Sequence, residues 1–190
     1  MKKIILIFAA VVFTTTVFSQ NVWKSDKNHS QLKFDITHLG VSTVSGAFTD
    51  FEASVTATKA DFSDAVFQLT AKAESINTGI EPRNNHLKSA DFFDVTTYPS
   101  LSFKSTGIKP AEKGKYILTG DLTMHGITKP VTMELLYRGT VTNPMSKKEV
   151  TGFRATGKIN RADFGIGPKF PAASVSEEVT ITADGEFGKQ

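Results

Sequence analysis

Residues 76–103 have the sequence INTGIEPRNNHLKSADFFDVTTYPSLSF, and they form the one long stretch beyond the N-terminus that lacks the pattern of a strand. The stretch opens with Asn77-Thr78-Gly79 and closes after Tyr98-Pro99. Asn, Gly, Asp and Pro at this density mark turns and loops, because their backbone preferences differ from those of regular strands. We therefore predict an insert, with a short helical segment around residues 84–93, that lies over the mouth or face of a β-structure.

The sequence on either side of this insert alternates apolar and polar residues with a period of two, which is the pattern of half-buried strands. Such runs cover residues 32–36, 44–48, 51–55, 67–73, 101–103, 116–124, 131–137, 153–159 and 179–187. The apolar positions change parity between Phe48 and Phe51, which predicts a bulge or a strong bend near Asp50. Lys59–Ser63 is the second candidate for a helical turn. The eight to nine strands predict an antiparallel meander, and residues 20–190 form one domain.

The strands fit either a sandwich or a barrel. Glycines stand inside several of them, at Gly46, Gly120, Gly157 and Gly185, where glycine otherwise weakens a sheet. Glycines at points of sharp coiling favour closure of the sheet into a barrel. About eight strands enclose room for side chains or for one small ligand. The sequence therefore predicts an all-β fold, an extended eight-stranded antiparallel barrel with a short helical insert.

The N-terminus has the regions of a secretory signal peptide. Lys2-Lys3 form the basic region, Ile4–Phe13 the apolar region, and Ser19 offers a small residue at the cleavage site. Three threonines interrupt the apolar run before it reaches the ~20 residues that a membrane-spanning helix needs. We expect residues 1–19 to be removed, so that the mature protein starts at Gln20, is exported to the periplasm or secreted, and has no stable membrane insertion. An uncleaved anchor is the alternative.

The composition excludes several functions. The chain has no cysteine, which removes disulfides, cysteine-ligated metals and thiol catalysis. Two of its three net positive charges come from Lys2 and Lys3, and the other basic residues are interspersed with acidic ones, so we predict no nucleic-acid partner. The chain holds 15 Phe against 3 Tyr and 1 Trp. This ratio fits either an ordinary β-core or a cavity lined by rings that have no polar group.

No catalytic or metal-binding motif is present in the sequence. The four histidines, His29, His38, His86 and His125, lack the short spacings of a metal site, although residues from separate strands can still converge. We expect His29 and His125 to be turn residues. No Gly-x-Ser-x-Gly sequence places a nucleophilic serine. We therefore predict no metal, no cofactor and no catalytic residue.

The insert contains the best candidate for recognition of an anionic group. Arg83 and His86 are three residues apart and would share one face of a helical turn. A guanidinium beside a histidine suits a phosphate or carboxylate head group. The alternative is a solvated loop in which Arg83 pairs with Glu81 or Asp91.

Many short motifs along the chain match one known family. In chain order they are Trp23-Lys24-Ser25-Asp26, His29-Ser30, Phe34, His38, Gly46, Phe48, Asn77-Thr78-Gly79, Arg83, His86-Leu87-Lys88-Ser89, Asp91-Phe92-Phe93-Asp94, Tyr98-Pro99, Phe103, Gly120-Asp121-Leu122-Thr123, Gly126, Thr128-Lys129-Pro130-Val131, Arg161 and Asp163-Phe164-Gly165. With these residues the chain resembles the YceI-like family over almost its whole length. Asn85 is a departure, because the family more usually has Asp there.

The resemblance implies a lipocalin-like barrel in an exported bacterial protein. Members of the family bind a long isoprenoid-type or other amphiphilic lipid, often as homodimers, and have no established catalytic residues. Within the motifs, Asp26, His29 and Thr128–Pro130 are expected to serve as structural turns.

Pattern and resemblance together give a set of candidate ligand-binding residues: Phe34, His38, Phe48, Arg83, His86, Phe92, Phe103, Leu122 and Phe164. The expected function is to bind or carry the lipid, with its tail among the inward apolar side chains and its head near Arg83 and His86. Two alternatives stay open. One is an enzyme that acts on such a lipid through His38, His86 and Asp91, and the other is a structural barrel without a ligand.

Overall fold

The computed structural model describes residues 20–190, so the predicted signal peptide lies outside the described residues. The strands are β1 (Asn21–His38), β2 (Ser42–Phe48), β3 (Phe51–Ala57), β4 (Val66–Lys72), β5 (Ile76–Asn77), β6 (Ser100–Pro110), β7 (Lys115–Met124), β8 (Ile127–Thr142), β9 (Glu149–Asn160) and β10 (Val175–Lys189). The helix α1 spans Glu81–Lys88, and the 3-10 turns η1 and η2 span Ala73–Ser75 and Arg161–Phe164.

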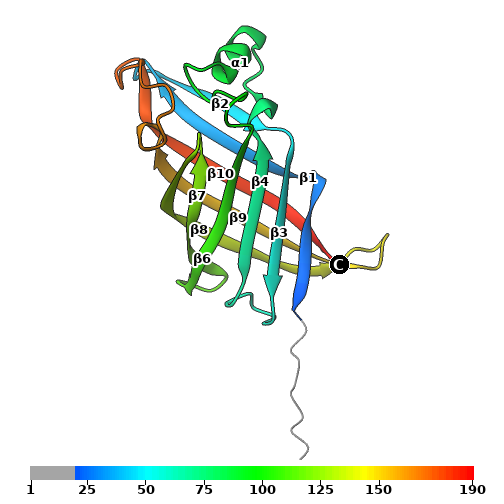
Figure 1. Cartoon of the computed structure of the whole chain (residues 1–190). Coiled ribbons are helices and arrows are strands. Elements are labelled where there is room, and N and C mark those ends of the chain that lie inside the picture. The colour runs from blue at the N-terminus through cyan, green and yellow to red at the C-terminus, as the bar shows by residue number, and fades with distance from the viewer. Residues whose placement is uncertain (1–19) are drawn as a thin grey trace, which may run out of the picture.

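The strands form one sheet that closes on itself (Figure 1), because β10 pairs with β1 as well as with β9. β2 pairs with the second half of β1 and β3 with its first half, so β2 and β3 act as one strand with a bend at residues 49–50. β2 and β3 count as one strand, and β5 is a two-residue strand that pairs only with the end of β2. The sheet is therefore a closed eight-stranded antiparallel barrel. Both the predicted fold class and the predicted bend near Asp50 are confirmed.

Side chains along the strands face the interior and the outside in turn, as the period of two in the sequence predicts. Along β7, the alternate residues Tyr116, Leu118, Gly120, Leu122 and Met124 are all buried, and the residues between them are exposed or half-buried. The interior contains two apolar clusters. One fills the end of the barrel near Trp23, where Phe62 from the β3–β4 connection packs against Trp23 and other rings. The second cluster lies toward the other end and leaves space inside the barrel.

The helical insert is shorter and begins earlier than predicted. α1 begins at Glu81 rather than near residue 84, because Pro82 is well suited to the first turn of a helix, where its missing N–H is not needed. The helix ends at Lys88, where Ser89 leaves the helical conformation and its Oγ donates a hydrogen bond to the His86 carbonyl at 2.7 Å. Residues 89–93 fold as turns.

Three further predictions about local structure are wrong. Lys59–Ser63 form turns instead of a helix, because Asp64 accepts hydrogen bonds from Thr58 and Lys59 and holds the chain back on itself. Thr128–Pro130 lie within β8, and His29 lies within β1 at an irregularity of the strand. The prediction for His125 is confirmed, since this residue occupies the β7–β8 turn with φ of 50°.

Candidate functional site

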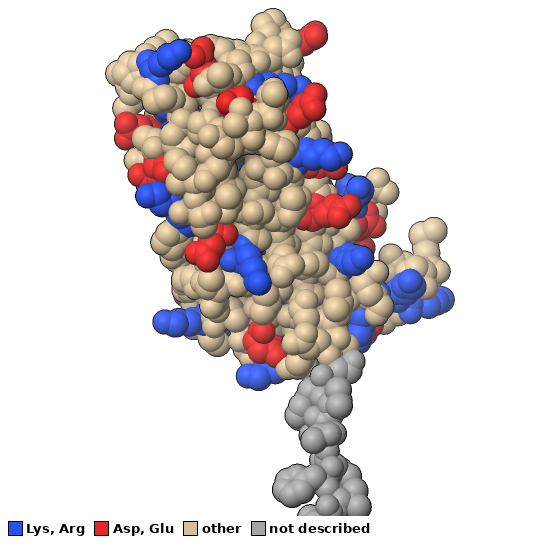
Figure 2. Space-filling model, in the orientation of Figure 1, with Lys and Arg blue, Asp and Glu red and all other residues tan. Residues whose placement is uncertain are grey.

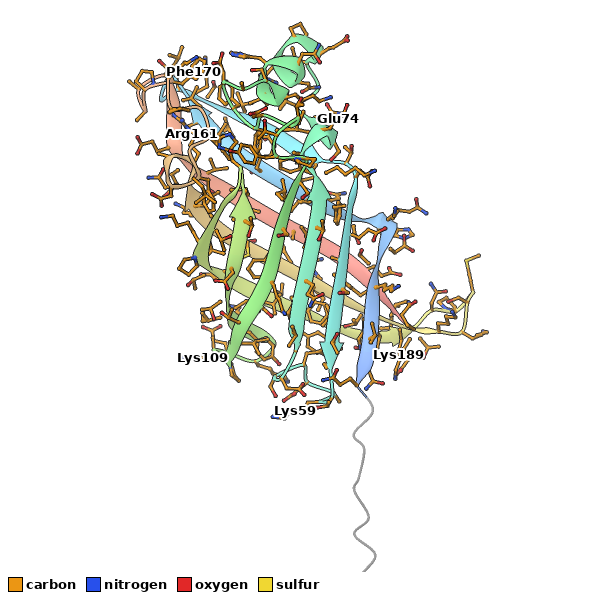
Figure 3. All side chains as sticks on the ribbon, in the orientation of Figure 1. Lys59, Glu74, Lys109, Arg161, Phe170 and Lys189 are labelled. Carbon is orange, nitrogen blue, oxygen red and sulfur yellow. The ribbon has the colours of Figure 1, made fainter. Side chains whose placement is uncertain are left out.

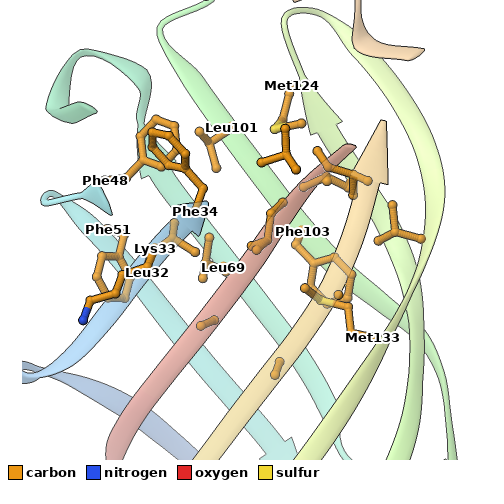
Figure 4. Close-up of a pocket in the computed structure, with 18 of the residues that line it drawn as sticks. Leu32, Lys33, Phe34, Phe48, Phe51, Leu69, Leu101, Phe103, Met124 and Met133 are labelled. Carbon is orange, nitrogen blue, oxygen red and sulfur yellow. The ribbon is translucent and has the colours of Figure 1, made fainter. Parts of the chain in front are cut away.

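The barrel encloses a cavity of about 490 Å³ that is bounded mainly by apolar side chains. Figure 4 shows side chains from several strands around it, among them Phe34, Phe48, Phe103 and Met133. Along β10, the lining runs from Val175 to Phe187 through the inward-facing positions. The cavity therefore extends along β10, a shape that suits one extended chain.

Two strand glycines make room for the phenyl rings on the cavity wall. A Cβ atom on Gly46 would lie 2.3 Å from Cζ of Phe34, and one on Gly120 would lie 2.4 Å from Cζ of Phe103. Any side chain at these positions would push the rings inward. The glycines thus have a packing role in addition to the coiling role that the sequence suggested.

Two segments cover the end of the barrel that lies opposite Trp23, and we call them together the cap: residues 78–99, which contain α1, and residues 165–175. Their rings meet, because Phe92 stacks on Phe170 at 4.7 Å between centroids and the His86 ring meets both edge-on. Lys169 Nζ also lies 2.7 Å from Asp91 Oδ1. The cap therefore joins the insert to a loop that is more than 70 residues away in the sequence.

Arg161 holds the second cap segment in place (Figure 3). This side chain is 4% exposed and lines the cavity, and no carboxylate of residues 20–190 lies within 4.0 Å of it. Its guanidinium donates to five backbone carbonyls at 2.6–3.0 Å, those of Ile166, Gly167, Phe170, Val175 and Ser176. All five N–H groups of the side chain are thereby used.

Arg83 is a cation at the cavity whose charge is not neutralised by a nearby carboxylate. It donates to Oγ1 and to the backbone carbonyl of Thr78, at 2.8 and 2.9 Å. Within the part of the chain that the structure describes, it forms neither of the ion pairs with Glu81 or Asp91 that were the alternative. Its Nη1 makes no hydrogen bond to a described residue. Arg83 can therefore still donate to a ligand.

His86 and Asp91 form a weaker contact beside it. Their closest nitrogen and oxygen atoms are 3.5 Å apart, and both side chains are partly exposed. The hydrogen bond and the charge of Lys169, followed by His86, lower the pKa of Asp91. Asp91 is therefore an anion at neutral pH and is engaged mainly by Lys169.

Eight of the nine candidate residues line the one cavity: Phe34, His38, Phe48, Arg83, His86, Phe92, Phe103 and Leu122. Phe164 does not line it; the side chain is 2% exposed and packs in the core beneath the cap. The sequence did not identify Arg161 or Phe170 as residues of the site. The available signal was the run of Gly and Pro from Gly165 to Pro171, which marks a loop with one ring in it.

The three residues of the enzyme alternative do not form a hydrogen-bonded group. His86 and Asp91 are neighbours, but no hydrogen bond or ion pair within residues 20–190 joins His38 to either. Asp91 also keeps Lys169 as its closest partner. The geometry thus offers no acid–base relay of the kind that this alternative requires.

The architecture is that of a closed antiparallel barrel whose interior has room for one small ligand. The chain matches the YceI-like domain over residues 23–187, and it belongs to the YceI-like family. The resemblance found in the sequence is thereby confirmed. One relative, Protein YceI of Salmonella agona, is 36% identical over 97% of this chain and 98% of its own.

Solved structures show the same fold. BcnA of Burkholderia cenocepacia has a TM-score of 0.75 and 27% identity, over 85% of this chain and 98% of its own. The YceI protein of Campylobacter jejuni has a TM-score of 0.74 and 28% identity, over 82% and 90%. A polyisoprenoid binding domain from Saccharophagus degradans, at 16% identity and a TM-score of 0.65 over 89% and 98%, shares the fold alone. No helix among residues 20–190 has both the length and the apolar character to cross a membrane.

Proposed function

We propose that the protein binds and carries a long-chain amphiphilic lipid of the isoprenoid type, with the tail in the barrel and the head at the cap. The observation that supports this most strongly is the mainly apolar lining of the cavity, which has the donors of Arg83 at its capped end. The polyisoprenoid binding domain from Saccharophagus degradans has the same fold, which is consistent with such a ligand.

The energetics favour an apolar chain. Removal of apolar surface from water contributes ~25 cal/mol per Å², so a tail that buries several hundred Å² gains enough to exceed the cost of ordering it. An unpaired polar head inside the barrel would cost roughly 1–3 kcal/mol. The head is therefore expected at the cap, where the free donor of Arg83 lies at the cavity.

The eight lining residues named above are the proposed ligand contacts, and Phe164 is proposed to support the cap from beneath. We propose a binding protein rather than an enzyme. The basic and acidic side chains are mixed over the face seen in Figure 2, which supports a role without nucleic acid.

We also propose that the protein acts outside the cytoplasm, as an exported and periplasmic carrier that starts at Gln20. The basis is the sequence of residues 1–19. N-terminal sequencing of the protein from its native compartment should find Gln20. Recovery of Met1 on a membrane-bound form would support the uncleaved anchor instead.

A pair of ligands that differ only in their head group tests the proposed function. Affinities are measured for a long-chain isoprenyl phosphate and for squalene, an isoprenoid hydrocarbon without a head. Arg83→Ala should weaken binding of the phosphate by roughly 5- to 100-fold, because a charge-assisted hydrogen bond is lost, and should leave squalene almost unaffected. Phe103→Ser should weaken both.

Arg138→Ala is the matched control, because Arg138 lies on the outside and pairs with Asp184. It should change neither affinity. If Arg83→Ala and His86→Ala proteins are folded and bind the phosphate as the native protein does, the head group lies elsewhere and the insert is a structural cover. If neither ligand binds the native protein, the lipid-binding proposal is wrong.

A further inference from the structure

Three side chains that could ligate a metal converge outside the cavity. Asp26 and His29 come from β1 and Glu186 from β10, and one donor atom of each lies within 4.8 Å of the other two. Nδ1 of His29 is 3.4 Å from Oδ1 of Asp26. Glu186 faces outward, because its neighbours Gly185 and Phe187 line the cavity and side chains alternate along a strand.

The pairing of β1 with β10 builds this group. Ser25 pairs with Phe187 and Ser30 with Gly185, so residues 26–29 of β1 stand opposite Glu186 alone. The extra residues bulge out of the ladder and bring Asp26 and His29 over Glu186. Gly185 permits this path, since a Cβ atom there would lie 2.6 Å from Oγ of Ser30.

The carboxylates of this group lack a permanent positive partner. Among residues 20–190, no Lys or Arg lies within 4.0 Å of Glu186, and the only basic group paired with Asp26 is His29. The backbone N–H of Asn28 donates a hydrogen bond to Oδ1 of Asp26 at 2.7 Å and so orients this side chain. Two close carboxylates repel each other, and a bound cation would remove that repulsion.

We propose that Asp26, His29 and Glu186 form a binding site for a divalent transition metal such as Zn²⁺. One imidazole nitrogen and two carboxylate oxygens suit Zn²⁺, Ni²⁺ or Cu²⁺ better than Ca²⁺ or Mg²⁺, which prefer oxygen ligands alone. Ligands at ~2.0–2.2 Å from a tetrahedral metal lie about 3.3–3.6 Å apart. The partly exposed side chains have the rotational freedom to close from 4.8 Å to that distance.

Such a metal would link β1 to β10, the two strands whose pairing closes the sheet into a barrel. A ligand that binds only the folded state raises its stability by mass action. The metal is therefore expected to stabilise the fold, and it has no contact with the cavity, so the site is independent of the proposed lipid function.

Calorimetric titration of the metal-free, full mature protein with ZnCl₂ tests the site. The expected result is one equivalent bound, at least tenfold weaker binding in Glu186→Gln and in His29→Ala, and no binding of MgCl₂. The melting temperature should rise by roughly 5–10 °C when Zn²⁺ is a hundredfold above its Kd. His38→Ala is the control, because it removes a histidine that has no carboxylate within 4.0 Å among the described residues, and its titration should match that of the native protein.

Glu186→Gln keeps the shape of the side chain, so this variant is expected to fold. A loss of Zn²⁺ binding then reports the loss of the carboxylate. The proposal is overturned if the native protein binds no Zn²⁺, or if it binds with the same affinity after Glu186→Gln. In either case the Asp26–His29 pair serves only to hold the bulge of β1.

Discussion

Replacement of Arg161 by Met should open the cap and destabilise the whole domain. Met has a similar length but no donors, so five backbone carbonyls lose their hydrogen-bond partner at once. Each buried carbonyl left unpaired costs about 1–3 kcal/mol. Two effects reduce the sum: the variant no longer buries a charge, and residues 165–175 can swing out so that water hydrates them.

We expect a net loss of about 3–5 kcal/mol in the free energy of unfolding, because the substitution breaks a buried hydrogen-bond network, one of the few changes with an effect that large. For a domain of this size the melting temperature should fall by roughly 6–20 °C. Arg161→Lys should recover only part of the loss, because one ammonium has three donors and cannot span the five carbonyls.

Guanidinium chloride unfolding gives the free energy, and amide hydrogen exchange over residues 165–175 shows whether the cap opens. The control is Arg138→Met, whose side chain is half exposed and paired with Asp184 on the surface, and it should cost no more than about 1 kcal/mol. If Arg161→Met has the same free energy of unfolding as the native protein, and residues 165–175 stay equally protected from hydrogen exchange, the role assigned to Arg161 is wrong.

Two further predictions follow from the wall and the cap. Gly120→Ala should destabilise the barrel by about 1–3 kcal/mol, because the new methyl group would lie 2.4–2.5 Å from the Phe103 ring and 2.6 Å from the Lys104 carbonyl oxygen. Gly188→Ala, whose methyl group would meet nothing within 4 Å, should be close to neutral in the same denaturant assay. Lys169 lowers the pKa of Asp91, so the contribution of this pair to cap closure is present above the ordinary pKa of an Asp and is lost as the pH falls through the lower, folded value. The amide NMR signals of residues 165–175 should therefore shift at acidic pH as Asp91 becomes protonated, and Asp91→Asn should abolish that pH dependence. A pH-dependent shift that persists in Asp91→Asn would mean that another group causes it.

The strands and their inward faces could be predicted because they depend on local alternation. The period of two in residues 116–124 fixes which side chains of β7 are buried, whatever the neighbouring strands are. The change of parity near Asp50 likewise predicted the bend, since a residue that breaks the alternation must break the ladder. The helix α1 begins earlier than the pattern predicts, because Pro82, a residue typical of turns, also fits the first turn of a helix.

Contacts between distant segments could not be predicted in the same way. Arg161 owes its role to five carbonyls, and carbonyls are present at every residue, so no sequence pattern reports them. The ring of Phe170 meets the insert only because the barrel brings both segments to one end. The convergence of His29 and Glu186 depends on the register of two strands more than 150 residues apart.

Organic extraction of the folded protein from its native compartment, followed by mass spectrometry, shows directly whether the barrel holds a lipid. We expect one long-chain, mainly hydrocarbon amphiphile per barrel. Ala155 lines the cavity, so Ala155→Trp should place a ring in that space and yield a folded protein with little or no such lipid. A native protein that releases no amphiphile, or an Ala155→Trp protein that carries as much as the native one, would contradict the claim that the barrel interior holds the ligand.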